Sequence, residues 1–563
     1  MYHPVLALSL LAVACHPPSI LSPDTGETVD TGAPEEPDLS DNVYDPDHLL
    51  RVEIEMDPED WDALRIEARD VWAMLGSEDC QSEPWDNPFD WYHADLTLDG
   101  TSFPHVAVRK KGFLGSLSED KPALKLDLSE YGEEATFWGV DHITLNNAIQ
   151  DPSYLRQCLG YGFYRDAGMP ASRCSYATVA VNGRELGVYV NVEPIKDLFL
   201  RRNFGSDHGG LIEGTLSDFR EGWTGTFEGK NDEADLSVIA AVADALTLGD
   251  GEVVEALEPL VDLDAFLTHW AAEVLSVHID GYAWNTNNFY LYADPQRGGR
   301  LRFIPWGIDG LLYGESDEGL PSSVYANGEL ARRLFGLEEP RVAYRTRLRE
   351  LLEGPWNEDV LNARIDRDRD LVLDALSGEE AEAATEAIEA LRRRMAGRRD
   401  EVNAALEREE TWDLGQRESF CFQDIGDLSA TFATTWGSIH EDAFTYGDAE
   451  LAFVLGDEAH VPTSLGAIAG DPQGPGVIYI AAWLTRTEAV VVYMTAPDEL
   501  IVPGDLELGF GDTIGALYYI DTATMEDFAF ISYLFGTLHL TAAGTGQGDS
   551  IEGYIDGDLM SWG

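Results

Sequence analysis

Apolar and polar positions alternate along much of the first part of the chain. From Leu49, the run "LLRVEIEM" places every second side chain on one face, as in a half-buried strand, and helical spacing follows Asp57-Pro58. Further alternating runs flank Asp99-Gly100 and Asn182-Gly183. These dipeptides favour tight hairpin turns because both of their residues adopt positive φ readily. We therefore predict a β-rich first region that contains two hairpins.

Helical periodicity dominates the middle of the chain, over about residues 263–277 and 330–406. In the first of these segments Phe266 and Trp270 lie on one stripe, which is typical of a core-facing helix. Between the two segments, the β-prone runs "NFYLYA" and "LRFIPW" flank the turn-rich stretch "DPQRGGR" and should pair as an antiparallel hairpin. Residues 42–408 together predict one α+β domain.

Beyond Thr411 the helical periodicity stops, and short β-prone runs separated by Gly, Pro and Asp take over. Runs such as "ELAFVLG", "GVIYIAAWLT" and "AVVVYMTA" are typical of a sandwich or barrel. We predict a separate all-β, sandwich-like domain over residues 409–563. This region has no clustered His or Cys and no nucleophile motif, so we expect a structural or surface-binding module.

The composition is that of a folded protein, with 44% hydrophobic residues in 563, but the charge is unusual. The chain has 103 acidic and 37 basic residues, which gives a net charge of −66. Such a surface repels nucleic acids, so we expect no nucleic-acid partner. The acidity favours a solvated surface adapted for solubility. Binding of divalent cations such as Ca²⁺, or of a basic protein partner, is the alternative.

The amino terminus carries an apolar run, Val5 to Val13, that is too short to cross a bilayer. The run leads to Cys15 through small residues, which resembles the lipobox of a bacterial lipoprotein, so we assign residues 1–15 to a signal peptide with a lipobox. No Lys or Arg precedes the run, which leaves an ordinary signal peptide or a misplaced start as alternatives. Residues 16–41 predict a disordered linker, because they are rich in Pro, Gly, Thr, Asp and Glu.

This leader implies an exported protein, and we expect an outer-membrane lipoprotein on the periplasmic or the cell-surface side. Its membrane contact would then be the lipid anchor on Cys15 alone. Four further cysteines are Cys80, Cys158, Cys174 and Cys421, and none forms a CxxC pair, which makes a zinc ribbon improbable. In an exported protein two disulfides are allowed, and of the three pairings we favour Cys158 with Cys174.

Acids and amides gather in the window around the predicted hairpin. In an antiparallel hairpin the start of the first strand lies beside the end of the second, so Asn288 and Asp309 should reach the same edge. Asp280 and Asn285 enter that edge from the preceding helix. Two carboxylates and one or two amides form a hard oxygen ligand set, which suits Mg²⁺, Mn²⁺ or Ca²⁺ rather than zinc.

The same window resembles the catalytic segment of a protein kinase, where an Asp and an Asn five positions later precede a hairpin that delivers a metal-binding Asp. The segment "DGYAWNTNNFYLYADPQRGGRLRFIPWGIDG" is similar to the corresponding segment of the CotH family of atypical protein kinases. "VRKKG" at 108–112, the segment 151–205 and the helical "RRRMAGRRDEV" resemble that family too. The resemblance covers about residues 47–408 and implies an atypical protein-kinase-like core followed by the β domain.

The resemblance implies a nucleotide site on the first region. Arg109, Lys111 and Lys125 would face the phosphates of ATP, and Glu193 would lie in the nucleotide hinge. The alternative for the three cations is that they are solvated strand residues, although cations are scarce in this acidic chain. For Glu193 the alternative is an ordinary acid at the end of a strand.

The resemblance also assigns roles within the window. Asp280 would orient or deprotonate the acceptor hydroxyl, and Asn288, or less favourably Asn285, would bind the metal; otherwise these are helix-capping or turn residues. Where the family has Pro-Trp-Asp-x-Asp, this chain has Gly307 in place of the first Asp. Asp309 would then have to hold the metal instead. If that Asp is what is missing, restoring it at Gly307 should raise activity.

Three functions follow as hypotheses. The first is an exported kinase that transfers phosphoryl from ATP, with Mg²⁺ or Mn²⁺, to Ser or Thr of a secreted or surface protein. The second is a non-catalytic envelope lipoprotein whose kinase-like fold and β domain bind a protein partner, which the change at Gly307 favours. A calcium-stabilised adhesin is the third.

Overall fold

The computed structural model describes residues 38–562, except 78, 132–134, 313–319, 417–418, 472–474, 510–512 and 522–527. The predicted signal peptide, Cys15 and most of the predicted linker lie outside the described residues. The described chain opens with the short helix η1 (Ser40–Asn42). Ser40 is buried there, so the described fold includes residues just before the predicted domain boundary at residue 42.

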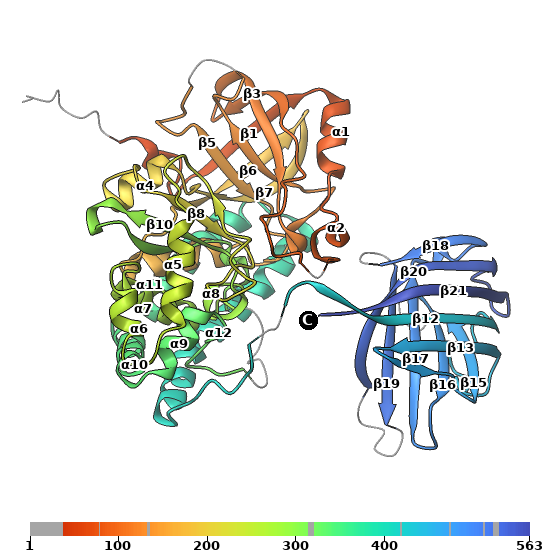
Figure 1. The fold of residues 1–563 in the computed structure, drawn as a ribbon. Coiled ribbons are helices and arrows are strands. Elements are labelled where there is room, and N and C mark those ends of the chain that lie inside the picture. The colour runs from red at the N-terminus through yellow and green to blue at the C-terminus, as the bar shows by residue number, and fades with distance from the viewer. Residues whose placement is uncertain are drawn as a thin grey trace, which may run out of the picture.

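The first part of the protein is a closed β-barrel (Figure 1). Its strands follow the order β1-β2-β3-β4-β5-β7-β6 and close where β1 pairs in parallel with β6. Both predicted hairpins are confirmed, since β2 pairs with β3 and β6 with β7. The strands are β1 (Leu49–Met56), β2 (Tyr92–Leu98), β3 (Thr101–Lys111), β4 (Ala123–Asp127), β5 (His142–Asn146), β6 (Cys174–Val181) and β7 (Arg184–Val192).

Alternation along β3 and β4 places successive side chains on opposite faces of the barrel wall. Val108, Leu124 and Leu126 are buried in the barrel core. Arg109 is the partner of Lys125 across the two strands, so both side chains leave the opposite face.

The barrel carries few helices, of which α3 (Arg156–Asp166) is the most deeply placed. Its side chains from Arg156 to Tyr164 are all buried. It contacts β6 of the barrel, α11 (Glu358–Leu373) and the short helix η4 (Ile308–Gly310). The helices that precede α3 are α1 (Pro58–Ile66), α2 (Val71–Leu75) and η2 (Leu114–Ser116).

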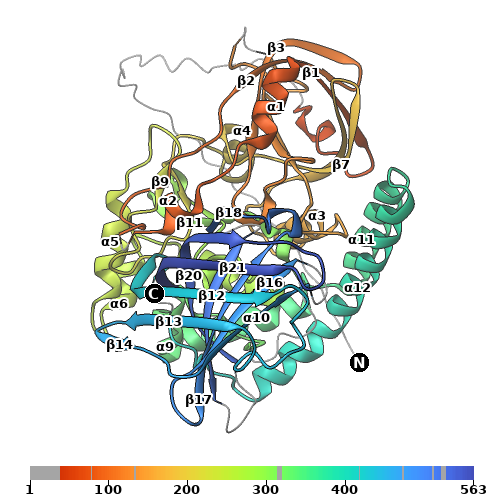
Figure 2. The same ribbon diagram turned by 90° about the vertical axis from the view of Figure 1, so that its right-hand side faces the viewer.

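The second part combines helices with a small sheet of order β11-β10-β8-β9. The predicted hairpin is confirmed, because Phe289 pairs with Pro305 and Asp294 with Arg300. Helix α12 runs along the outside of this part (Figure 2). The strands are β8 (Leu211–Gly214), β9 (Glu228–Gly229), β10 (Phe289–Asp294) and β11 (Arg300–Pro305), and the short helices are η3 (Pro295–Arg297) and η4 (Ile308–Gly310). The α-helices are α4 (Asp197–Phe204), α5 (Ser237–Leu246), α6 (Val253–Leu257), α7 (Leu263–Leu275), α8 (Tyr282–Asn285), α9 (Glu329–Gly336), α10 (Glu338–Glu353), α11 (Glu358–Leu373) and α12 (Gly378–Glu407).

The last part is all-β, as predicted, and the α+β fold class with a β-rich C-terminal region is confirmed (Figure 1). One sheet of 10 strands curls until Trp436, just after β12, bridges to Ala469 of β15, so the two packed faces come from a single sheet. The elements are β12 (Phe422–Thr435), β13 (Asp448–Leu455), β14 (Glu458–His460), β15 (Leu465–Gly470), β16 (Gly476–Trp483), β17 (Glu488–Ala496), η5 (Asp498–Leu500), β18 (Gly504–Leu508), β19 (Ile514–Asp521), β20 (Phe528–Ala542) and β21 (Ser550–Trp562).

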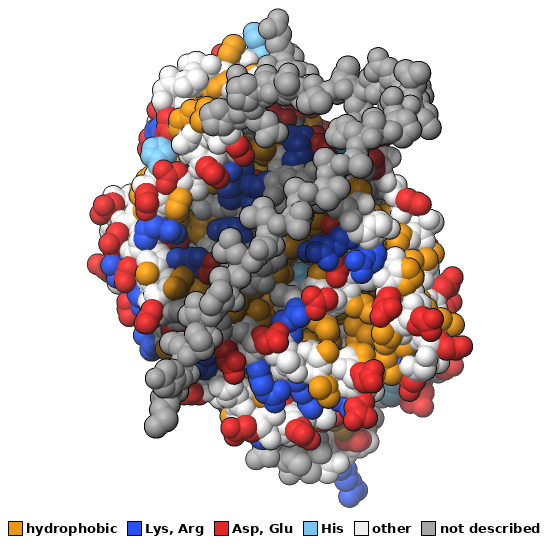
Figure 3. Space-filling model, turned by 90° about the vertical axis from the view of Figure 1, so that its left-hand side faces the viewer, with side chains coloured by type: hydrophobic (Ala, Val, Ile, Leu, Met, Phe, Trp, Pro, Cys, Tyr) orange, Lys and Arg blue, Asp and Glu red, His pale blue; other side chains and the backbone are white. Residues whose placement is uncertain are grey.

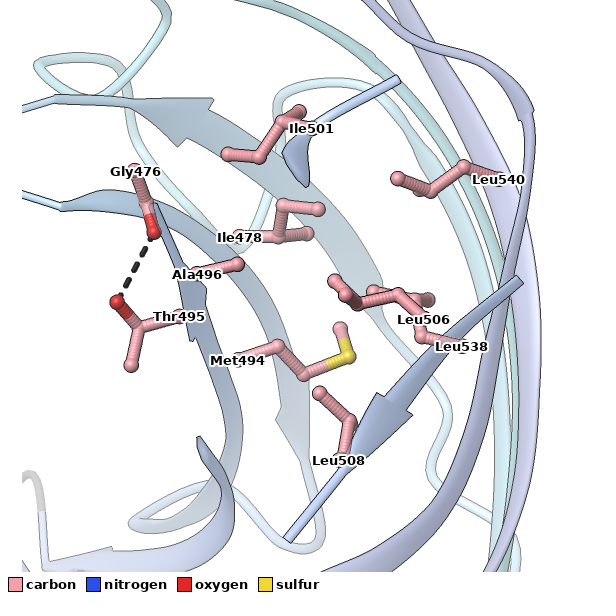
Figure 4. A pocket seen from close by; sticks show the side chains of 10 residues that line it. All are labelled: Gly476, Ile478, Met494, Thr495, Ala496, Ile501, Leu506, Leu508, Leu538 and Leu540. Carbon is pink, nitrogen blue, oxygen red and sulfur yellow. Dashed lines mark hydrogen bonds between the residues drawn. The ribbon is translucent and has the colours of Figure 1, made fainter. Parts of the chain in front are cut away.

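The concave side of this sheet is filled by its own side chains. Figure 4 shows Ile478, Met494, Leu508 and Leu538 converging from different strands. The hollow left between them measures about 10 Å³, which is room for about one water molecule. At this place the interior is therefore a packed core.

Two disulfides tie the chain together. Cys158–Cys174 joins α3 to β6, which confirms the favoured pairing. Cys80–Cys421 links the loop after α2 to the start of β12, across a sequence separation of 341. An apolar cluster that includes Met74 and Met560 surrounds this second disulfide, so the β sheet is fastened to the kinase-like region there. In the described part of the chain, no helix combines the length and the apolar character needed to cross a bilayer.

Candidate functional site

Asp280 lies in the loop that joins α7 to α8, and three side-chain amides hold its carboxylate. Asn285 and Asn287 donate to its Oδ1 across 2.6 and 3.2 Å. Asn288 donates to its Oδ2 across 2.5 Å. The predicted convergence of Asp280, Asn285 and Asn288 is thus observed, and Asn287 joins them although the sequence analysis did not single it out.

A buried acid keeps this loop in place. Both oxygens of Glu273 accept backbone N–H groups at the start of α8, from Tyr282 and Ala283, each across 2.9 Å. His269 lies 3.1 Å from the same carboxylate. Gly281 passes so close that a Cβ there would lie 2.3 Å from a Glu273 oxygen. The loop conformation therefore requires glycine at position 281 and a carboxylate at position 273.

Asp309 reaches the same place from the end of the β10–β11 hairpin. Desolvation in the surrounding protein raises the pKa of Asp309 to about 6, and the negative charge of Asp280 adds to that rise. Lys111 acts in the opposite direction. Asp309 thus interacts electrostatically with Asp280 of the loop before α8 and with Lys111 of β3.

Gly307 is the position at which an aspartate was expected. It adopts a φ of 53°, a conformation that side-chain-bearing residues rarely adopt. A Cβ at Gly307 would lie 2.2 Å from Oδ1 of Asn288. The Asn288 amide therefore fills the space that an aspartate side chain would need, which revises the expectation that restoring the acid alone raises activity.

Two lysines of the barrel face this group of acids. Desolvation lowers the pKa of Lys111 to about 8, against the attraction of Asp309 and then Glu213. It lowers the pKa of Lys125 to about 7, against the attraction of Glu213 and with the repulsion of Lys111 and Arg109. Both lysines keep part of their surface accessible. The Lys111 ammonium also donates to the side-chain oxygen of Asn146.

Glu213 of β8 completes the facing wall, and sequence reasoning missed it. Tyr290 donates to Glu213 across 2.6 Å, and Lys230 lies 3.0 Å from its other oxygen. Desolvation opposes ionisation of Glu213, but Lys230, Tyr290 and Lys125 outweigh it and hold the pKa of this acid below its usual range. Glu213 follows no recognisable motif, and only the pairing of β8 with β10 brings it here.

Arg109 and Glu193 differ from the other predicted nucleotide contacts. The Arg109 guanidinium lies 4.4 Å from the centre of the Trp91 ring, and its Nε is buried without a hydrogen-bond partner among the described residues. Glu193 is buried elsewhere, and each of its oxygens accepts from both Arg173 and Arg202. The Glu193 side chain is therefore part of an ion-pair cluster with two arginines. Because both of its oxygens are occupied there, we do not retain its predicted contact with a nucleotide.

The donor set is compatible with a hard divalent cation. Asp280, Asp309 and Asn288 present oxygens, and Mg²⁺ typically takes one or two carboxylates and completes its shell with water and substrate phosphates. In the described residues, no group of three or more His, Cys, Asp or Glu side chains is arranged to hold a metal. The set therefore fits a cation only together with phosphate oxygens, as in kinase sites.

A chain of hydrogen bonds joins this loop to the β sheet. Asn287 accepts from the backbone N–H of Leu216 across 3.2 Å, and Gln81 donates to the carbonyl of Leu216 across 2.9 Å. The other end of the Gln81 amide accepts from the N–H of Phe420 across 3.2 Å. Phe420 precedes the disulfide-bonded Cys421, so the acid loop and the linker to β12 share a continuous polar path.

Comparison with known proteins matches residues 108–392, just over half of the chain, to the family described as CotH kinase protein. The inner spore coat protein H of Bacillus subtilis (strain 168) is 24% identical over 271 residues, which cover 45% of this chain and 73% of that protein. The inner spore coat protein H-like protein of the same organism is 34% identical over 64 residues, or 11% of this chain and 21% of that protein.

A search of solved structures finds the toxin–antitoxin complex of HipA, HipB and operator DNA from Shewanella oneidensis MR-1. The match has a TM-score of 0.29 and 14% identity, and it covers 52% of this chain and 67% of that one. A likeness of this size carries no argument about fold or function. The family match lies inside the predicted kinase-like domain and spans the barrel cations, the acid loop and the hairpin. The chain belongs to the CotH kinase protein family.

Proposed function

We propose that this protein is a metal-dependent protein kinase that transfers the γ-phosphoryl group of ATP to a Ser or Thr hydroxyl of a surface-associated protein. One observation carries the proposal: the Lys111 ammonium of the barrel lies 5.9 Å from the centre of the Trp306 ring at the end of the hairpin, where the charge of Asp309 acts on it. A cation for phosphate and an acid for metal therefore lie near one another. The family match supports the same chemistry.

The barrel cations would neutralise the nucleotide. Lys111 and Lys125 would face the phosphates, and Arg109 lies beside Lys125 on the same strand face. Both lysines have lowered pKa values because the protein desolvates them. Negative phosphate oxygens favour the protonated ammonium groups, so nucleotide binding and protonation assist each other. The negative charge of Glu213 attracts both lysines.

Asp280 would act on the acceptor. Three amide donors fix the direction of its carboxylate, which leaves it to orient the hydroxyl and take its proton as the oxygen attacks. The acceptor oxygen forms a bond to the γ-phosphorus, the bond from that phosphorus to the bridging oxygen breaks, and ADP leaves with the electron pair. A Mg²⁺ or Mn²⁺ ion held by Asp309 and Asn288 would neutralise the phosphate charge in this step.

A non-catalytic binding role is the second candidate, and Gly307 favours it. The family's carboxylate is missing at this position, and the Asn288 side chain occupies its place. If Asp309 does not compensate, the fold would bind nucleotide weakly and act as a partner-binding module. The acidic surface and the curled β sheet are compatible with that role.

The curated relative and the predicted signal peptide both support a location at the cell surface or envelope. The curated relative is named as a spore coat protein, which supports a surface-associated protein here. The lipobox-like segment supports export and a lipid anchor on Cys15. Protein partners or substrates at the cell envelope would then be the acceptors, and Ca²⁺ could replace Mg²⁺ in a structural role.

A thermal-shift titration with ATP and Mg²⁺ or Mn²⁺ tests the proposal. We expect stabilisation that needs both metal and nucleotide, and its loss in Asp309→Asn and Lys111→Met. Asp264→Asn, a change of an exposed acid at the start of α7, serves as control. Phosphate incorporation into Ser or Thr of an envelope fraction, absent in Asp280→Asn, would then separate the kinase from the binding module. No shift in the wild type at any metal concentration contradicts both nucleotide-dependent roles.

A further inference from the structure

A cavity of about 290 Å³ lies on the far side of α3 from the candidate site. Its walls come from α3, the start of β6, α11 and the segment after η1. Four arginines line it: Arg165, Arg173, Arg364 and Arg367. Figure 3 shows one face of the molecule, on which Lys and Arg side chains lie near the middle among acidic side chains. In a chain of net charge −66, four guanidinium groups around one cavity are a local concentration of positive charge, although Asp41 lines the cavity as well.

Three of these arginines have carboxylate partners. Arg173 pairs with Glu193 and with Asp41, each across 2.7 Å. Arg364 pairs with Asp166 and Arg367 with Asp368, each across 2.6 Å. These pairs fix the guanidinium groups in place. Each guanidinium has five N–H donors, so a single carboxylate does not exhaust it.

Arg165 is different. Among the described residues it has no carboxylate within 4.0 Å, and its guanidinium donates to the backbone carbonyl of Ser172. Desolvation lowers the pKa of Arg165 to about 10, and the positive charges of Arg202 and Arg364 add to the effect. The Nε of Arg173 is also buried without a hydrogen-bond partner in the described structure. The acids that act on Arg165 are Glu193 and Asp166, and both are paired with other arginines, so no carboxylate of its own balances the charge of Arg165.

We propose that this cavity is a binding site for a phosphomonoester group. Guanidinium forks match the oxygens of a tetrahedral phosphate in geometry and charge. The volume is at the lower end of the range for ligand pockets, which suits a phosphate and a short part of its carrier. The Tyr44 ring, 4.8 Å from the Arg173 guanidinium, and the Cys158–Cys174 disulfide supply an apolar wall for that carrier. The carrier is either a small molecule or a phosphorylated Ser or Thr side chain.

This site is distinct from the proposed nucleotide cleft, because α3 separates the two. On its other side, Gln157 of α3 accepts from Asn146, which in turn accepts from Lys111. Gly160 of the same helix packs so closely on η4 that a Cβ would lie 2.6 Å from Leu311. The proposal therefore goes beyond the proposed function and does not depend on it.

Thermal unfolding of the full chain in potassium phosphate and in potassium chloride of equal ionic strength tests the proposal. We expect phosphate to raise the melting temperature of the wild type in a saturable way, with a dissociation constant in the millimolar range or below. Arg165→Gln should weaken phosphate binding at least tenfold without leaving a carboxylate unpaired. Arg369→Gln, on the same helix as Arg364 but paired with Asp366 and Asp370, is the matched control and should bind as the wild type does.

Two further variants keep the result decisive. Arg165→Lys retains the charge without the fork, so it should fold and bind phosphate several-fold more weakly even if Arg165→Gln is unstable. Lys111→Met should keep the phosphate effect. No phosphate effect in the wild type, full binding by both Arg165 variants, or loss in Lys111→Met would overturn the proposal.

The carrier is identified by titrating O-phosphoserine and a phosphoserine peptide against the same variants. Tighter binding of the peptide than of the free amino acid points to a phosphorylated protein, and equal binding points to a small phosphomonoester. Binding of either that is insensitive to Arg165→Gln counts against the site.

Discussion

The side-chain amide of Asn288 donates to Asp280 across 2.5 Å, and its amide oxygen would lie only 2.2 Å from a Cβ added at Gly307. One side chain thus links the acid of the loop to the position at which the family's metal-binding acid is absent. The loss of the aspartate and the orientation of Asn288 are parts of one arrangement. A change at either residue should therefore be felt at the other.

The first prediction concerns the missing carboxylate. Gly307→Asp should lower the free energy of unfolding by about 1–3 kcal/mol, because it combines a positive φ with a steric overlap. It should not raise nucleotide binding by itself. Chemical denaturation measures the first effect and calorimetry the second. Gly310→Asp, with open space around its Cβ position, is the control and should be nearly neutral. Wild-type stability with raised activity in Gly307→Asp would contradict this account of Asn288.

The second prediction is that Lys125 takes up a proton when nucleotide binds. The pKa of Lys125 is about 7 in the folded protein, below the ordinary lysine value, because desolvation outweighs the attraction of Glu213. Near pH 8 the side chain is mostly neutral, and bound phosphates should protonate it. Calorimetry in buffers of different ionisation enthalpy should therefore show proton uptake on nucleotide binding at pH 8 and little at pH 6. Lys125→Met should reduce the uptake, and unchanged uptake would exclude this lysine as its source.

The same lysine affects stability with a definite sign. Between pH 7 and the ordinary lysine pKa, the unfolded chain binds more protons at Lys125 than the folded one, so this group's contribution to stability rises with pH. Glu213→Gln removes the largest charge that favours protonated Lys125, so it should lower the pKa of Lys125 further. The pH range over which stability rises should then extend to lower pH. Urea unfolding of wild type, Glu213→Gln and Lys125→Met from pH 6 to 10 measures the shift. A wild-type slope that persists in Lys125→Met would assign the effect to other groups.

The third prediction concerns the link to the β sheet. Gln81→Ala removes two hydrogen bonds, to the Leu216 carbonyl and from the Phe420 N–H, and should cost about 1–3 kcal/mol of stability. It should also weaken nucleotide binding, because Leu216 positions Asn287. Gln416→Ala removes a side chain from the same linker that bonds to α9 rather than to Leu216, and should leave nucleotide affinity unchanged. Equal nucleotide affinity in the two variants would show that the path does not reach Asp280.

The fourth prediction concerns Gly281. Gly281→Ala would place a Cβ 2.3 Å from the Glu273 carboxylate, which also accepts two backbone N–H groups of α8. We expect a loss of about 2 kcal/mol or more, since the displaced carboxylate leaves those buried donors unpaired. Urea unfolding gives the value. Gly251→Ala, at a position with open space, should change stability by less than half as much.

Local pattern predicted most of the elements and the meeting of acids and amides. The turn dipeptides at residues 99–100 and 182–183 and the alternation from Leu49 predicted β1, β2, β3, β6 and β7, because their chemistry is local. The hairpin predicted that Asn288 would meet the loop acid. Closure of the barrel by parallel pairing of β1 with β6 could not be predicted, since it joins strands over a hundred residues apart with no mark in either.

The facing wall of the site shows the same limit. Glu213 and Gln81 lie outside every motif, and they act here only because β8 pairs with β10 and because Cys80 is bonded to Cys421. Glu193 shows the opposite error. Its position at the end of a strand resembled a nucleotide hinge, but Arg173 and Arg202 take both of its oxygens. A sequence pattern identifies the type of residue at a site, whereas the side chains that it contacts are determined by the tertiary fold.

The central claim is that the cations of β3 and β4 and the acids of the hairpin enclose one nucleotide–metal site. A double-mutant cycle on Lys111 and Asp309, with the affinity for ATP and Mg²⁺ measured by calorimetry, tests it most directly. Our account predicts measurable wild-type binding and a coupling energy of about 0.5–3 kcal/mol between Lys111→Met and Asp309→Asn. Additive effects of the two substitutions within error, or no binding by the wild type, would contradict it.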